Sequence, residues 1–113
     1  MCRALLVLCV ARDPDRLRAL RLAAAGAEWE LTKGATSTEE ALRQLEERSP
    51  HILVVEGDLG DLVAAARSAR PGLRVISVGP LPAADAEVGG LDEIRRAVRT
   101  TPSPGGPVRG PAP

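Results

Sequence analysis

Apolar residues occur in short runs separated by amphipathic segments along most of the chain. Residues 3–10 (RALLVLCV), 51–55 (HILVV) and 74–78 (RVISV) are nearly continuous runs of strand-forming apolar residues. Such runs are typical of parallel strands covered on both faces. Residues 27–31 alternate apolar and acidic positions, which predicts a short, half-exposed strand. After residue 79 the pattern weakens, and residues 86–88 are the stretch that fits a vestigial strand.

Helix signals lie between these strands. Asp13 is an N-cap residue followed by a proline at the first helical position, and Gly26 is expected to cap the other end of that helix. Ser37 and Glu40 form an S-x-x-E capping box that opens a second helix, which runs to residue 48. The apolar face of the first helix comprises Leu17, Leu20, Ala24 and Ala25.

Two more helices complete the alternation. Residues 61–70 are rich in alanine, with Asp61 suited to the N-cap, and residues 91–99 carry apolar side chains at helical spacing. Strands that alternate with helices in this way specify βαβ units and a parallel sheet. We therefore predict a three-layer α/β domain over residues 1–100, with four or five strands and a shortened region after the fourth. The Pro/Gly-rich residues 101–113 are expected to form a disordered tail.

The composition of the chain argues against nucleic-acid binding, a metal site and a cofactor. The 113 residues carry 15 basic and 15 acidic side chains, with Trp29 as the single Phe, Trp or Tyr residue. Such a chain offers neither the positive footprint nor the stacking platforms of a nucleic-acid-binding protein. There is no CxxC motif and His51 is the one histidine, so no metal site is expected. No cofactor is expected, because both common phosphate-binding glycine motifs are absent from the sequence.

The longest apolar run, residues 4–11, is too short to span a bilayer. It resembles a weak signal peptide, with Arg3 before it and Ala11 at the cleavage position. We interpret it instead as a buried first strand, because the rest of the predicted fold needs that strand. We therefore expect a cytoplasmic protein that does not contact a membrane.

Three stretches of the sequence resemble the receiver domain of two-component response regulators. Residues 3–31 resemble its first strand, first helix and second strand. Residues 35–59 (ATSTEEALRQLEERSPHILVVEGDL) resemble its second helix and phosphoacceptor strand, and residues 69–79 (ARPGLRVISVG) resemble the entry to its fourth strand. The resemblance implies a flavodoxin-like, receiver-like fold and a role in bacterial signal transduction.

Receiver domains accept a phosphoryl group on an Asp at the end of the third strand, beside an acidic pair that holds Mg²⁺. By this resemblance, Glu56 stands at the phosphoacceptor position. Ala11 and Arg12 stand at the acidic-pair positions, with Asp13 just beyond them, and Asp58 would offer a backbone carbonyl to the metal.

The remaining positions of the family's site also differ. Gly79 stands where the family has a Thr or Ser, with Ser77 two residues earlier on the strand. The family's Lys falls near residues 89–90, which are both glycine. Without two carboxylates the pocket holds Mg²⁺ poorly, and Glu56 is one methylene longer than Asp. We therefore predict that aspartyl phosphorylation is lost and that no residue of this chain is catalytic.

The first functional hypothesis is a stand-alone, degenerate pseudo-receiver that contacts a kinase, a regulator or an output protein. Its expected surfaces are the first helix, residues 13–25, and the side formed by residues 79–99. Glu56 is then either a fixed negative charge that imitates the phosphorylated state or a surface carboxylate without a role. A related hypothesis pairs Arg12 with Glu56 where the family keeps its metal.

Other interpretations stay open. An atypical phospho-accepting or ligand-binding domain would use Asp13, Asp58 or Arg12 for a small anion. A weak cation site would use Asp13 with Glu56, and a remnant would have no partner at all. Trp29 is either an interface anchor or a partly buried residue of an edge strand. Ser37 is interpreted as an N-cap rather than a nucleophile, and His51 as structural rather than a phosphoryl or metal residue.

Overall fold

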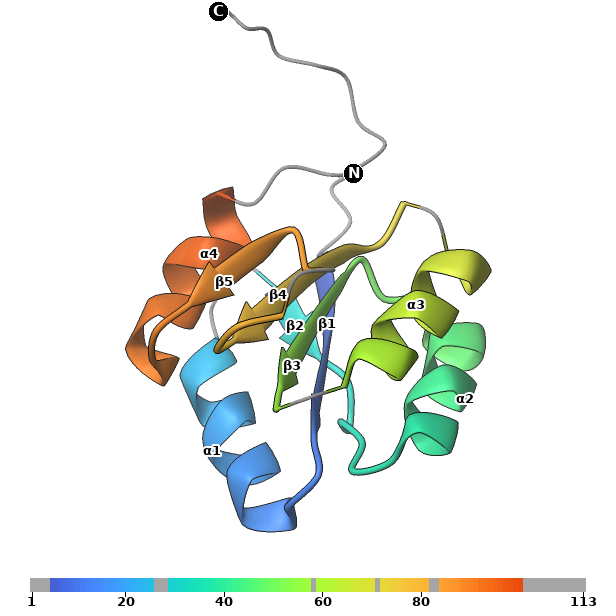
Figure 1. Cartoon of the computed structure of the whole chain (residues 1–113), viewed down its shortest axis with the longest axis horizontal. Coiled ribbons are helices and arrows are strands. Elements are labelled where there is room, and N and C mark those ends of the chain that lie inside the picture. The colour runs from blue at the N-terminus through green and yellow to red at the C-terminus, as the bar shows by residue number, and fades with distance from the viewer. Residues whose placement is uncertain (1–4, 26–28, 58, 71, 82–83, 101–113) are drawn as a thin grey trace, which may run out of the picture.

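A parallel sheet of five strands forms the middle layer of the structure, a computed structural model that describes residues 5–25, 29–57, 59–70, 72–81 and 84–100 (Figure 1). The strands are β1 (Leu5–Ala11), β2 (Trp29–Leu31), β3 (Ile52–Glu56), β4 (Arg74–Val78) and β5 (Ala86–Val88). They lie in the order β2-β1-β3-β4-β5, and every neighbouring pair is parallel. This is a doubly wound order that reverses between β1 and β3. The predicted flavodoxin-like fold is confirmed.

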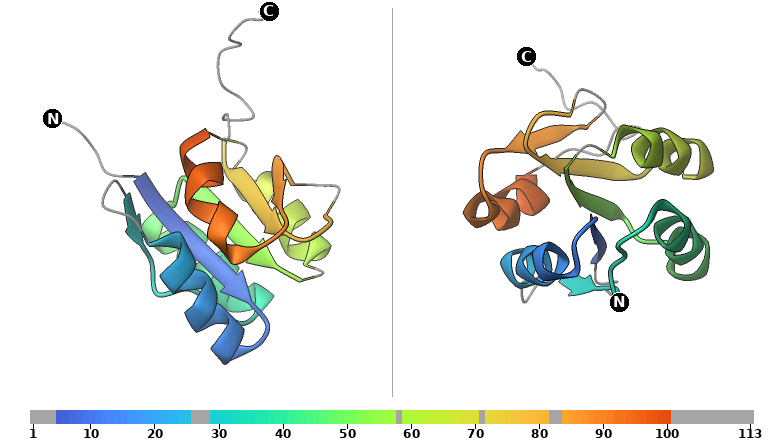
Figure 2. Two further views of the ribbon diagram at one scale, coloured as in Figure 1. Left: turned by 90° about the vertical axis from the view of Figure 1, so that its left-hand side faces the viewer. Right: turned by 60° about the horizontal axis from the view of Figure 1, so that its bottom comes forward.

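Helices cover both faces of the sheet, as the two views in Figure 2 show. On one face lie α1 (Pro14–Ala24) and α4 (Ile94–Thr100), the latter preceded by a 3-10 turn, η1 (Leu91–Glu93). On the other face lie α2 (Thr38–Arg48) and α3 (Gly60–Ala69). None of the helices within the described ranges is long and apolar enough to cross a membrane.

The central strands are apolar on both sides because both of their faces are buried. In β1, Leu8 and Val10 pack toward α2 and α3, whereas Val7 and Cys9 pack toward α1 and α4. The first four residues of β3, residues 52–55, are all fully buried. The continuous apolar runs in the sequence therefore follow from a sheet enclosed between two helix layers.

The predicted helix starts are confirmed where a side chain caps the helix. Oδ1 of Asp13 accepts a hydrogen bond from the Asp15 amide at 3.1 Å, and Oγ of Ser37 accepts one from the Glu40 amide at 3.2 Å. These bonds satisfy amides that have no partner within the helix.

Several predicted boundaries are wrong by one or two residues. The first helix ends at Ala24 with Ala25 as its cap, and Gly26 lies outside the described residues. The third helix begins at Gly60 after Leu59, which makes no side-chain cap, so Asp61 lies in the first turn instead of capping it. The third strand spans residues 52–56, one position later than predicted, and the last helix reaches Thr100. Residues 101–113 lie outside the described residues.

The connection from β4 to β5 is short, and its described residues, 79–81 and 84–85, contain no helix. Leu81 is buried against the α2–α3 side of the core. The carboxylate of Asp85 accepts a hydrogen bond from the Val75 amide at 2.8 Å and pairs with Arg67 of α3 at 3.0 Å. Leu81 and Asp85 thus hold this connection where a crossover helix would otherwise lie, as the predicted shortening after the fourth strand requires.

Trp29 is the first residue of β2, the strand at the opposite edge of the sheet. This residue is 5% exposed, and its indole Nε1 donates a hydrogen bond to the Ala24 carbonyl at 2.6 Å. Arg95 of α4 donates to the Ala25 carbonyl at 2.6 Å, and the Arg99 guanidinium lies 5.9 Å from the centre of the indole ring. Trp29 therefore joins α1 to α4 and is too buried to anchor a partner.

Candidate functional site

The candidate site lies where the carboxyl ends of β1 and β3 meet. Ala11 is the register partner of Glu56, so the last residues of the two strands lie side by side. The strand order reverses between these two strands, and doubly wound folds bind their ligands at this point. The structure thus brings Glu56 and Ala11 together.

Glu56 forms an ion pair with Arg16 of α1. Nε of Arg16 donates to both carboxylate oxygens of Glu56, each at 3.1 Å, and Nη2 also donates to Oε2. The side chain of Glu56 is 18% exposed, whereas that of Arg16 is 52% exposed. The hydrogen bonds and the charge of Glu56 raise the pKa of Arg16 above its ordinary value. The arrangement places a fixed positive charge against the carboxylate at the end of β3.

The start of α1 positions Arg16. Asp13 caps the helix, its carbonyl accepts the Leu17 amide at 2.8 Å, and Pro14 occupies the first helical position. Arg16 therefore lies in the first turn, next to the end of β3. The hypothesis that Arg12 holds Glu56 is corrected: the salt bridge comes from Arg16, four residues later, because the helix turns that side chain toward β3.

A hollow of about 240 Å³ surrounds the ion pair. Its lining residues are Ala11, Arg12, Asp13, Arg16, Glu56 and Gly57. The hollow therefore gathers the phosphoacceptor-equivalent residue and all three acidic-pocket-equivalent residues that the resemblance identified.

Arg12 also lines a second hollow of about 240 Å³, together with residues at the starts of α2 and α3. The residues beside it are Thr38, Leu59, Gly60, Asp61 and Leu62. Arg12 is exposed and lines both hollows.

The switch-equivalent residues lie at the end of β4. Ser77 is fully buried, and its Oγ donates a hydrogen bond to the Gly79 carbonyl at 2.8 Å. Gly79 has a φ of +99° and its amide donates to the Val88 carbonyl at 3.0 Å, which ties it to β5. The hydroxyl hydrogen of Ser77 is therefore already bonded to a main-chain carbonyl in the turn after β4.

The metal-contact and lysine positions of the family's site complete the comparison. Asp58, proposed to offer a backbone contact to a metal, lies outside the described residues. Near the family's lysine position, the Gly89 amide donates to Oε1 of Glu93 at 3.0 Å, so an acidic side chain lies there instead of a cation. Within the described ranges, no three His, Cys, Asp or Glu side chains gather as a metal site would require.

Sequence reasoning missed Arg16 and Asp85. The signal for Arg16 was its place in the first turn after Asp13, on a helix whose start must face the carboxyl end of the sheet. His51, in contrast, has the predicted structural role, because its Nδ1 accepts a hydrogen bond from the Leu6 amide at 3.1 Å.

No family model and no curated protein matches this sequence. Among solved structures, the signal receiver domain of an HD domain-containing protein from Pseudomonas fluorescens Pf-5 is similar with a TM-score of 0.74 at 17% identity, over 88% of this chain and 94% of that chain. A CheY-like protein (tadZ) from Pseudomonas aeruginosa PAO1 has a TM-score of 0.64 at 23% identity, over 87% and 99% of the two chains.

A cobalamin-binding protein from Desulfitobacterium hafniense DCB-2 is also similar, with a TM-score of 0.66 at 17% identity, over 86% of this chain and 59% of that chain. At such identities the likeness concerns the fold, and one fold serves several functions. The chain therefore has the fold of a response-regulator receiver domain, and its function must be argued from the site.

Proposed function

We propose that this chain is a stand-alone pseudo-receiver, a non-catalytic protein-interaction module of bacterial signal transduction that works without phosphorylation. The observation that carries the proposal is the ion pair of Glu56 with Arg16 at the carboxyl edge of the sheet. That edge is where the fold binds its ligands, and here it is occupied by the chain's own charges.

The residues around the pair support the loss of phosphoryl transfer. The transfer needs cations that neutralise charge on the moving phosphoryl group, and Mg²⁺ needs several oxygen ligands. Ala11 presents a methyl group beside Glu56, and Gly79 carries no hydroxyl. Both oxygens of Glu56 already accept hydrogen bonds from Arg16.

A fixed ion pair also supports a single functional state. Phosphorylation adds and removes charge at this point in a receiver domain, whereas the pair of Glu56 and Arg16 is built from the chain's own side chains. We infer that the interaction surfaces are permanently presented, to a cytoplasmic kinase, regulator or output protein.

The test is an amide NMR titration of the full chain, first with Mg²⁺ and then with beryllofluoride, a phosphoryl mimic. We expect a well-dispersed spectrum without shifts, while a phosphorylatable receiver domain titrated in parallel responds. Shifts clustered at Asp13, Glu56 and Gly79 would overturn the proposal.

The Arg16→Ala variant makes the same titration sharper. If the pocket has lost its chemistry, removing Arg16 leaves the spectrum unresponsive to beryllofluoride. A response in the variant alone would show that Arg16 blocks a site that can still bind a phosphoryl group, and it would contradict the proposal.

The second candidate is a small-anion-binding domain, favoured by the place of Arg12 beside both hollows. A bound anion stabilises the folded state, so this function requires a rise in melting temperature with inorganic phosphate. The rise must disappear in Arg12→Ala, and an unchanged melting temperature in the unmodified chain rejects this candidate.

A further inference from the structure

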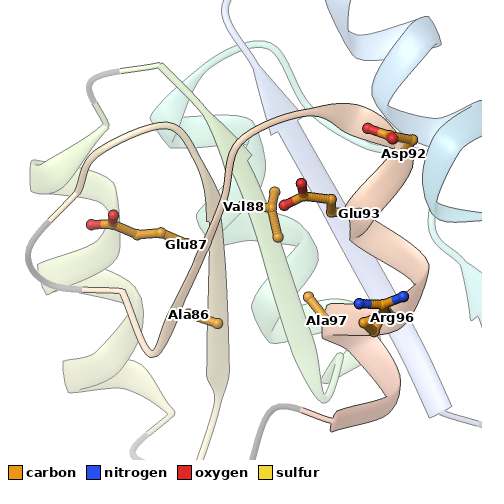
Figure 3. Close-up of a pocket in the computed structure, with 7 residues that line it drawn as sticks. All are labelled: Ala86, Glu87, Val88, Asp92, Glu93, Arg96 and Ala97. Carbon is orange, nitrogen blue, oxygen red and sulfur yellow. The ribbon is translucent and has the colours of Figure 1, made fainter.

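A groove of about 490 Å³ lies beside β5, at the edge of the sheet. β5 is the last strand in the sheet order, so its outer side has no partner strand among the described residues. Figure 3 shows the residues that line the groove: Ala86, Glu87, Val88, Asp92, Glu93, Arg96 and Ala97.

The main chain of β5 offers hydrogen-bonding groups to this groove. The Val88 carbonyl accepts the Gly79 amide at 3.0 Å, so the main chain of Val88 faces β4. Main-chain groups of successive residues in a strand point to opposite sides, so those of Glu87 face the open edge. An open edge of this kind is a template for a further strand.

The wall of the groove that faces β5 is formed by η1 and α4, and it is acidic. In Figure 3 the side chain of Glu87 points away from α4, whereas Glu93 and Ala97 lie between α4 and β5. Asp92 and Glu93 are exposed, and the Gly89 amide holds the Glu93 carboxylate at 3.0 Å. With Arg96 as the one basic side chain of this lining, the wall carries net negative charge.

We propose that this groove binds an extended, basic segment of a protein partner, which adds to β5 as a further strand. Its main chain would pair with Glu87, and its lysine or arginine side chains would face Asp92 and Glu93. The small side chains of Ala86 and Ala97 leave room for it. The mode is strand addition, in which main-chain bonds give affinity and side chains give specificity.

This inference rests on the proposed function, because it names the contact through which an interaction module would hold its partner. Charge complementarity decides which partner the groove fits. Asp92 and Glu93 outnumber Arg96 on this wall, so a basic segment is favoured over a second copy of this chain, which would bring the same acidic wall.

The probe is a short peptide of alternating lysine and valine, titrated into the uniformly labelled full chain and followed by amide NMR. We expect shifts confined to residues 86–89 and 92–97 and slower hydrogen exchange at the Glu87 amide. A glutamate–valine peptide, and a lysine–valine peptide with N-methylated main-chain amides, should give no shifts at these residues.

Asp92→Lys reverses one charge on the wall and should weaken binding of the lysine peptide about tenfold. Glu30→Lys, an exposed residue of β2 on the opposite edge, is the matched control and should leave binding unchanged. Equal binding of both peptides, or shifts centred on β2, would overturn the inference. So would a concentration-dependent fall in the diffusion coefficient that maps to β5, because it would identify a second copy as the occupant.

The two proposals fail separately. A beryllofluoride response at the ends of β1 and β3 overturns the pseudo-receiver function and says nothing against the groove. If neither beryllofluoride nor the lysine–valine peptide shifts any amide resonance, the strand-addition site alone is overturned.

Discussion

Arg16 and Glu56 join the first turn of α1 to the end of β3, although 40 positions separate them in the chain. An ion pair with one strongly exposed partner contributes little to stability, because water and salt screen it. Its effect is to hold a positive charge against Glu56, which is the basis of the proposed function.

The first prediction concerns this pair. Arg16→Ala and Glu56→Gln should each lower the melting temperature slightly, by less than the core variant Leu20→Ala does. The double variant should lose no more than either single variant, and the effect should fade at high salt. Arg18→Ala, an exposed neighbour on the same helix, is the control and should show no coupling to Glu56→Gln. Additive losses that persist at high salt would show that the two side chains do not act as a pair.

Cys9 gives a prediction at high pH. Burial raises the pKa of its thiol from the ordinary 9.0 to about 12, while the charge of Arg21 lowers it in part. The unfolded chain therefore loses this proton at a lower pH than the folded protein. Stability from this group is constant below pH 9 and falls above it, by at most about 1.4 kcal/mol per pH unit.

Urea unfolding at several pH values, in a Cys2→Ser background, measures this dependence. Subtracting the profile of Cys9→Ala in the same background isolates the contribution of Cys9. Identical slopes for the two proteins above pH 9 would contradict the prediction.

Among the elements, the connection between β4 and β5 departs most from an ordinary βαβ unit. Parallel strands are usually joined by a crossover helix, and residues 79–81 and 84–85 contain none. Asp85 compensates, because it accepts the buried Val75 amide and pairs with Arg67. Glu87 assists from β5, where Oε2 accepts the Leu81 amide at 3.0 Å.

The third prediction tests this tether. Asp85→Ala leaves the Val75 amide without its acceptor and should destabilise the protein by about 1–3 kcal/mol. Asp85→Asn keeps an acceptor oxygen and loses only the charge pair with Arg67, so its cost should be smaller. Chemical denaturation gives both values, and hydrogen exchange should accelerate at Val75 and Leu81 in the alanine variant. Equal costs for the two variants would assign the effect to the charge instead.

At the scale of the whole molecule, two apolar layers share one sheet. Leu20 belongs to the layer under α1 and α4, and Leu45 to the layer under α2 and α3. Both side chains are buried, and alternate residues of β1 and β3 contribute to both layers. Removing a buried side chain from either layer should therefore destabilise the whole domain, which should unfold as one cooperative unit.

The fourth prediction follows from this sharing. Leu20→Ala and Leu45→Ala should each cost about 2–5 kcal/mol. For each variant, Trp29 fluorescence, which reports on the α1–α4 side, should coincide with far-UV circular dichroism throughout unfolding. Two separated transitions in Leu45→Ala would show that the layers melt independently.

Local chemistry explains which predictions from the sequence succeeded. The caps at Asp13 and Ser37 each depend on neighbours within three positions, and a strand buried on both faces needs an apolar run. The start of α3 was misplaced because Leu59 makes no side-chain cap there, so the chain offers no local signal. The identity of the partner of Glu56 was also wrong, because Arg12 and Arg16 are equally basic and only helix geometry separates them.

The sequence by itself determined the alternation of strands and helices and the parallel sheet. These properties depend on residue type and on spacing within one element. The tertiary structure alone decided that Arg16 meets Glu56, that Asp85 replaces a crossover helix and that an acidic groove opens beside β5. These contacts join elements that are distant in the chain, and their geometry is set by how helices pack on the sheet.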